Sequence, residues 1–129
     1  MSQVGEFEFD PELIPEAPEL PLEQEIVLEI AAAERKETVN EQDGRKSIRI
    51  AIRAGSPDLV GAQSVFASLW VTEQYRGKAH KSFAQFLKTV GLPYTTQAQD
   101  LVKVRFAGKV RKQVKNPDFL ELYEVSGKA

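Results

Sequence analysis

The sequence predicts a mainly β domain with a single helix, and three observations lead to this fold class. Segments in which apolar and polar residues alternate recur along the chain, as in residues 46–54 and 119–125, and a strand places successive side chains on opposite faces. Turn-forming residues such as Asp43 and Gly44 separate these segments. Residues 78–90 are the one stretch whose apolar side chains recur at the spacing of a helix.

The first two strands are expected on either side of the Asp-Gly turn. Residues 25–37 begin as a strand, and their AAAERKE end fits either a helix or a strongly curved strand; we expect the strand. Residues 46–54 alternate cleanly, with three isoleucines on one face and two arginines, Arg49 and Arg53, on the other. The isoleucine face is expected to point into a core.

The third strand is predicted over residues 60–71. One face is apolar from Val65 to Val71, while the other carries two serines together with Phe66 and Trp70. The serines place this second face toward water, which would expose both rings. A strand buried on both sides would instead use the rings to fill a secondary cluster, so both interpretations stay open.

The helix predicted over residues 78–90 has one apolar stripe. Its members are Ala79, Phe83, Phe86, Leu87 and Val90. Gly91 is expected to cap the C-terminus of the helix, and Pro93 to stop it. A loop that carries Tyr75 at its tip precedes the helix.

The fourth strand, predicted over residues 101–115, would be apolar on one face and cationic on the other. The apolar set is Val102, Val104, Phe106, Gly108, Val110, Lys112 and Val114, and the other set is Lys103, Arg105, Ala107, Lys109, Arg111, Gln113 and Lys115. Gly108 in the middle indicates a bulge or a bend. Two interpretations of the cationic face are equally good. The face could bind a polyanion, or its Lys and Arg residues could serve only to keep the strand soluble.

Three strands, a helix and two further strands make up the expected order, with the helix between strands three and four. Five short antiparallel strands with this insertion predict an OB-like barrel, which we assign to residues 25–129. This fold binds ligands on the face of its second and third strands. The loops that join strands one to two and four to five contribute as well; here they are residues 40–46 and 112–118.

Residues 1–24 are predicted to be an acidic, Pro-rich leader outside the barrel. Residues 1–30 hold nine acidic residues and no basic one, whereas residues 31–129 hold seventeen basic against ten acidic residues, a formal charge of +7. The leader also contains apolar side chains that would dock either on the body or on a protein partner. They are Phe7, Phe9, Leu13, Ile14, Leu20 and Leu22.

Several function classes find no support in the sequence. There is no cysteine, His80 is the only histidine and is expected at the surface, and no Gly-rich phosphate loop occurs. We therefore expect no enzyme, no metal and no cofactor. No apolar run approaches the roughly 18 residues of a membrane span, and the N-terminal region lacks the positive charge of a secretory signal. A cytoplasmic protein is the expectation.

From about residue 25 the chain resembles a family of small phage-encoded proteins of uncharacterised or single-stranded-DNA-binding type. The motifs that carry the resemblance are a DGR-like turn followed by LVGAQSVFASLWV, a helix that ends in FLKTVGLP, and DLVKVRFAGKV. The last motif departs from the family pattern, because Lys103 stands where the family usually has glycine. The resemblance implies an OB-like barrel and a role in phage DNA replication or recombination, and a phage-encoded protein would act in the cytoplasm of the host cell.

We therefore expect a sequence-tolerant single-stranded DNA-binding protein, with RNA as the other candidate ligand. Cations would neutralise phosphates and aromatic rings would stack on bases. The candidate binding residues are Arg49, Arg53, Phe66, Trp70, Tyr75, Lys103, Arg105, Lys109 and Arg111. The alternatives are a phage structural or assembly protein whose N-terminal arm docks on a neighbour, and an adaptor or inhibitor. The sequence leaves open whether the protein forms a homo-oligomer.

Overall fold

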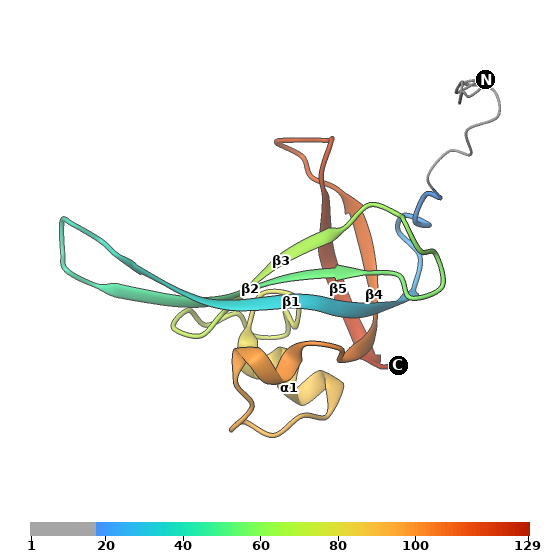
Figure 1. The fold of residues 1–129 in the computed structure, drawn as a ribbon. Coiled ribbons are helices and arrows are strands. Elements are labelled where there is room, and N and C mark those ends of the chain that lie inside the picture. The colour runs from blue at the N-terminus through green and yellow to red at the C-terminus, as the bar shows by residue number, and fades with distance from the viewer. Residues whose placement is uncertain (1–17) are drawn as a thin grey trace, which may run out of the picture.

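The computed structural model describes residues 18–129, and Figure 1 shows their arrangement. The elements in chain order are β1 (Ile26–Val39), β2 (Lys46–Gly55), β3 (Val65–Trp70), α1 (Phe83–Val90), the 3₁₀ helix η1 (Ala98–Leu101), β4 (Arg105–Lys112) and β5 (Leu120–Lys128). This order confirms a mainly β fold with its α-helix between the third and fourth strands.

The five strands form one sheet that closes in a ring, in the order β1-β2-β3-β5-β4, with β4 paired back to β1. The expectation of a wholly antiparallel sheet is wrong at one position, because β3 and β5 run parallel. A physical reason lies in the number of strands. Strand direction cannot alternate all the way around a closed ring with an odd number of members, so one neighbouring pair must be parallel.

Alternation along the strands builds the core inside the ring. The buried apolar side chains come from all five strands, and the least exposed include Leu28, Ile30, Val65, Leu69, Phe106 and Val110. Helix α1 adds Phe86, whose ring meets that of Phe106 edge to face with 5.3 Å between their centroids. Ile50 and Ile52 are also buried, which confirms the predicted inward face of β2.

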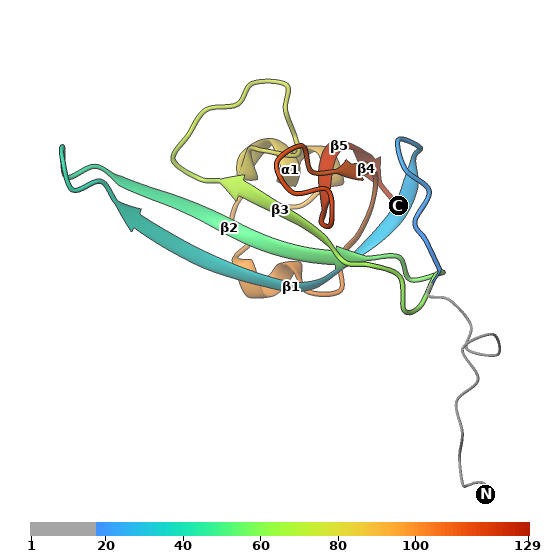
Figure 2. The same ribbon diagram turned by 90° about the horizontal axis from the view of Figure 1, so that it is seen from above.

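The β1–β2 hairpin extends well beyond the ring as an arm (residues 34–48), seen from two sides in Figures 1 and 2. Its strand character over the AAAERKE segment decides against the helical interpretation. The predicted turn is present: the Asn40 side chain accepts a hydrogen bond from the Gln42 N–H, and Gly44 has a φ of 68°. The ion pair of Lys46 on β2 with Glu37 on β1 links the two strands of the arm near its tip, and Arg35 pairs with the same carboxylate from within β1.

Helix α1 is shorter than predicted, because residues 78–82 are held in another conformation. The Lys81 carbonyl accepts a hydrogen bond of 2.6 Å from the Trp70 N–H, which ties this segment to the end of β3. Ser82 then caps the helix by accepting a hydrogen bond from the Gln85 N–H. The C-terminal prediction is confirmed, since Gly91 is left-handed, with a φ of 76°.

The fourth strand is also shorter than the predicted 101–115. Leu101 ends η1, and Val102 and Val114 are 40% and 85% exposed instead of facing the core. The predicted irregularity at Gly108 is present, because the β4–β5 register shifts between Ala107 and Gly108 and again between Lys109 and Val110. The last strand extends beyond the predicted 119–125 and ends at Lys128.

The part of the leader that the structure describes lies on the body. Leu20 is 5% exposed and belongs to the core, and Leu22 packs against it. The Glu23 N–H donates to the Val110 carbonyl at 2.8 Å. The other four apolar leader residues named above fall outside the described residues. Within residues 18–129, no helix combines the length and apolar character needed to cross a membrane.

Candidate functional site

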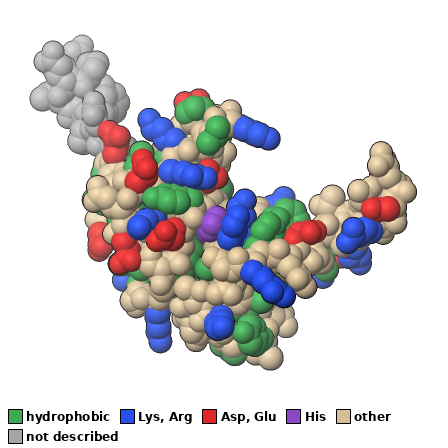
Figure 3. Space-filling view, turned by 180° about the vertical axis from the view of Figure 1, so that it is seen from behind, with side chains coloured by type: hydrophobic (Ala, Val, Ile, Leu, Met, Phe, Trp, Pro, Cys, Tyr) green, Lys and Arg blue, Asp and Glu red, His purple; other side chains and the backbone are tan. Residues whose placement is uncertain are grey.

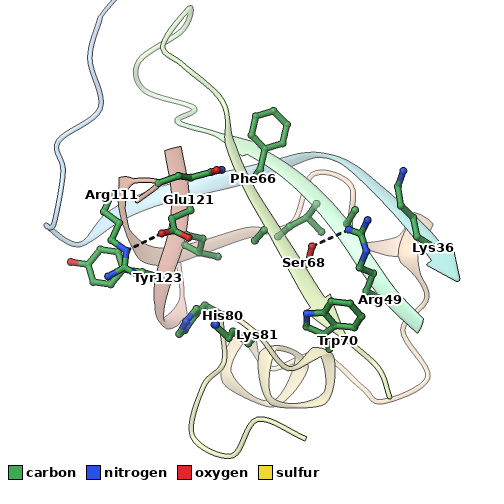
Figure 4. Close-up of a pocket in the computed structure, with 15 residues that line it drawn as sticks. Lys36, Arg49, Phe66, Ser68, Trp70, His80, Lys81, Arg111, Glu121 and Tyr123 are labelled. Carbon is green, nitrogen blue, oxygen red and sulfur yellow. Dashed lines mark hydrogen bonds and ion pairs between the residues drawn. The ribbon is translucent and has the colours of Figure 1, made fainter. Parts of the chain in front are cut away.

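A groove of about 540 Å³ lies on the outside of the ring, between β3 and β5. These strands pair at only two positions, Val65 with Leu120 and Phe66 with Glu121, and beyond them they diverge (Figure 4). Nine of the side chains that line the groove are charged or carry a ring. They are Lys36, Arg49, Phe66, Trp70, His80, Lys81, Arg111, Glu121 and Tyr123. Every strand of the ring thus supplies at least one of them.

The outer face of β2 and β3 forms the floor of this site. Arg49 lies directly opposite Trp70, and Arg53 directly opposite Phe66, so each ring has a guanidinium beside it on the same face. Phe66 is 41% exposed and Trp70 is half-buried. The question left open by the sequence is therefore settled: both rings are on the outer face and neither is a core residue. Val71, by contrast, is exposed and not in the core.

A row of three side chains crosses β1, β2 and β3 at one end of the groove. Lys36 is the register partner of Arg49, which is in turn the partner of Trp70. The Arg49 guanidinium lies 6.0 Å from the centre of the Trp70 ring and donates to the Ser68 hydroxyl at 2.9 Å. Two cations directly opposite each other cost stability. A bound anion between them would remove that cost.

The β4–β5 hairpin forms the opposite side of the groove. The Arg111 guanidinium contacts the Glu121 carboxylate at 3.1 Å and lies 5.1 Å from the centre of the Tyr123 ring. This ion pair holds the arginine in place over the ring, while both charged groups keep access to water. Gln113, from the loop predicted to take part in binding, also lines the groove.

His80, the single purple side chain of Figure 3, lies near the middle of a face on which basic and acidic side chains are mixed. It is half-buried, contrary to the expected surface position. Burial, and then the cations Lys81, Lys78 and Arg111, lower the pKa of His80 below its ordinary value, while Glu121 acts in the opposite direction. The imidazole is therefore neutral at pH 7 and offers hydrogen bonds without adding to the positive charge.

This pKa shift predicts that the protein loses stability as the pH falls below about 6.5. The unfolded chain takes up a proton on His80 near pH 6.5, before the folded protein does. The contribution of the neutral imidazole is complete above that pH and is lost as the pH falls through the lower folded value. Urea denaturation at several pH values should show a steeper loss for the natural protein than for His80→Gln. Parallel curves for the two proteins would contradict the shift.

Four of the predicted binding residues lie away from the groove. Arg105 pairs with Glu29 at 2.8 Å, and Lys109 pairs with Glu124 at 3.3 Å. Lys103 lies in the turn before β4 with a φ of 74°. The expectation of one continuous cationic face on the fourth strand is therefore wrong. Bulges in β4 and ion pairs with the neighbouring strands β1 and β5 place these cations at different points around the ring.

Tyr75 is the fourth of these residues. It lines a separate hollow of about 390 Å³ beside α1. The Lys81 ammonium is 5.8 Å from the centre of its ring. The structure therefore brings together Arg49, Phe66, Trp70 and Arg111 in the groove, with Arg53 on the same face.

Sequence reasoning missed Lys36, His80, Lys81 and Tyr123. Lys36 lies in a mixed-charge segment in which nothing distinguishes it from its neighbours. Its place became visible only through the register that sets it opposite Arg49. A signal for Tyr123 existed, because the alternation of the last strand puts it on the face opposite to Leu122, which is buried.

Lys and Arg outnumber acids four to one among the side chains of the groove. Among residues 18–129, no three His, Asp or Glu side chains lie close enough together to hold a metal ion. Comparisons of the chain with protein-family models, with curated proteins and with solved structures find no match. The assignment of function therefore depends on the geometry of the groove.

Proposed function

We propose that this protein is an OB-like barrel that binds single-stranded DNA without strong sequence preference. The fold part of the proposal is supported by the ring of five strands in the order β1-β2-β3-β5-β4 and by the helix between β3 and β4. The groove over β2 and β3, flanked by the β4–β5 connection, lies where an OB-fold binds oligonucleotides.

The observation that carries the functional proposal is the row of Lys36, Arg49 and Trp70. Two opposed cations give a site for a phosphate, and the ring beside them gives a platform for the attached base. Every base has an aromatic face, so such contacts tolerate any sequence. A duplex hides its base faces within the stack, so the same site favours single strands over double strands.

The groove also limits how much of the affinity is electrostatic. Of its four cations, Arg111 is already paired with Glu121 at 3.1 Å, and Lys36 has a longer, solvent-exposed pair with Glu34 at 3.7 Å. An exposed pair of this kind is weak, so we count Lys36 with Arg49 and Lys81 as available to phosphates, together with Arg53 on the same face. With about four phosphate contacts at roughly 0.7 each, the logarithm of the affinity should fall against the logarithm of the salt concentration with a slope near −3.

The single tryptophan of the chain makes the test direct. Trp70 lies in the groove, so oligo-dT that stacks on it should quench its fluorescence, and added salt should reverse the quenching. A duplex of the same length should quench less. Absence of both quenching and binding by a long oligo-dT at low salt would remove the proposal.

The resemblance noted above supplies the setting that we propose for this activity, which is DNA replication or recombination in a phage. Binding and protecting exposed single strands requires no chemical step. The proposal therefore assigns the groove a binding role and no catalytic one.

A further inference from the structure

The groove face carries two ring-and-guanidinium pairs. We define the Trp70 subsite as Trp70 with Arg49 and Lys36, and the Phe66 subsite as Phe66 with Arg53 and the neighbouring Phe119. The register places Arg49 opposite Trp70 and Arg53 opposite Phe66. The two rings are therefore repeated units on the same pair of strands.

The Phe66 subsite has the exposure of a binding surface. Phe66 and Phe119 are 41% and 45% exposed, and their rings meet edge to face with 6.3 Å between centroids. An edge-to-face contact covers at most one of the two faces of the Phe66 ring. Arg53 is exposed, and no ion pair to it is found among residues 18–129.

The spacing of the two rings restricts the form of the ligand. Phe66 and Trp70 are four residues apart on one strand, which corresponds to roughly 13 Å. Successive bases of a stacked strand are about 3.4 Å apart. Neighbouring bases cannot reach both rings, so the strand must span several nucleotides between them. The Ser68 side chain, on the same face between the rings, leaves room for that span.

We propose that the Trp70 and Phe66 subsites bind two non-adjacent bases of one strand, so that the full ligand is an oligonucleotide of at least three to five nucleotides. This inference rests on the proposed function and adds the minimal length of its ligand. Mononucleotides and dinucleotides occupy one subsite and bind weakly. Longer strands gain the second stacking contact, which is worth roughly 5- to 150-fold in affinity.

A length series tests the inference with Trp70 fluorescence as the readout. The full chain is titrated at low salt with oligo-dT of two, four, six, eight and twelve nucleotides. Affinity should rise steeply between two and six nucleotides and only gradually beyond. Phe66→Ala should remove this step, lowering the affinity for twelve nucleotides roughly 5- to 150-fold and that for two nucleotides much less, because a dinucleotide gains no second stacking contact in the natural protein.

Two further variants keep the result interpretable. Tyr94→Ala removes an aromatic side chain that is 70% exposed and away from the groove, and it should bind all lengths as the natural protein does. If Phe66→Ala melts at a lower temperature, Phe66→Leu retains apolar contact with Phe119 but lacks the aromatic face, and it should lose the same step. A Phe66 effect that is equal at all lengths, or absent, overturns the inference. If the natural protein does not bind twelve nucleotides at all, the proposed function itself fails.

Discussion

Arg49→Glu is expected to lower the affinity for single-stranded DNA by roughly 10- to 100-fold, about 1.4–2.8 kcal/mol, without unfolding the protein. The substitution removes the cation beside Trp70 and places a carboxylate where a phosphate would bind. It also puts that carboxylate opposite Lys36, which replaces a repulsive pair by an attractive one. Fluorescence titration with oligo-dT measures the loss, and a thermal melt measures the stability.

Stability should change little, because two effects of Arg49→Glu oppose each other. The protein loses the hydrogen bond from Arg49 to Ser68 and gains the attraction between Glu and Lys36. A residue kept for stability would show the reverse pattern, with a lower melting temperature and unchanged binding. That pattern would contradict the role assigned to Arg49.

Lys103→Glu is the matched control for charge. It makes the same change of two units on the same protein, but Lys103 lies in the turn before β4, outside the groove. We expect an affinity loss several-fold smaller than that of Arg49→Glu, since only long-range repulsion remains and salt screens it. Equal losses of affinity for the two variants would show that the net charge of the protein governs binding, and would contradict a binding site in the groove.

Gly108→Ala is expected to destabilise the fold by about 1–3 kcal/mol, with a drop in melting temperature on the order of 5–10 °C. A Cβ at this position would lie 2.7 Å from the carbonyl oxygen of Glu124 and 3.0 Å from a methyl group of Leu122. The first of these atoms belongs to the backbone of β5, which cannot move without disturbing the β4–β5 pairing. Calorimetry or a chemical denaturation curve gives the measurement.

Gly127→Ala, on the strand paired with β4, is the control for the glycine. Gly127 lies opposite Ala107, its φ is not positive, and a Cβ there meets no atom within 4 Å. Alanine should therefore be neutral or stabilising by about 0.4–1 kcal/mol, because it restricts the unfolded chain. If Gly108→Ala and Gly127→Ala have the same melting temperature, the close approach at Gly108 does not constrain the fold.

Local patterns in the sequence predicted local structure well. The alternation of residues 46–54 gave β2 with Ile50 and Ile52 inside, and the Asp-Gly pair gave the turn of the arm. These features depend on residues a few positions apart, whose preferences act within one element. The ends of elements were less predictable. Residues 78–82 fit a helical stripe, but their hydrogen bond to the end of β3 starts the helix at Phe83.

The sequence by itself determined that the chain is a mainly β fold with a basic body. It also determined that Phe66 and Trp70 share a face with Arg49 and Arg53 in the β2–β3 ladder, because strand alternation fixes which side chains lie on the same face. Tertiary structure decided which cations meet those rings. Lys36 comes opposite Arg49 through the hairpin register, and Arg111 reaches the groove through β4–β5 pairing. Lys109, two residues earlier, pairs with Glu124 instead. Contacts between distant strands depend on register, bulges and ring closure, and no local period in the sequence encodes these.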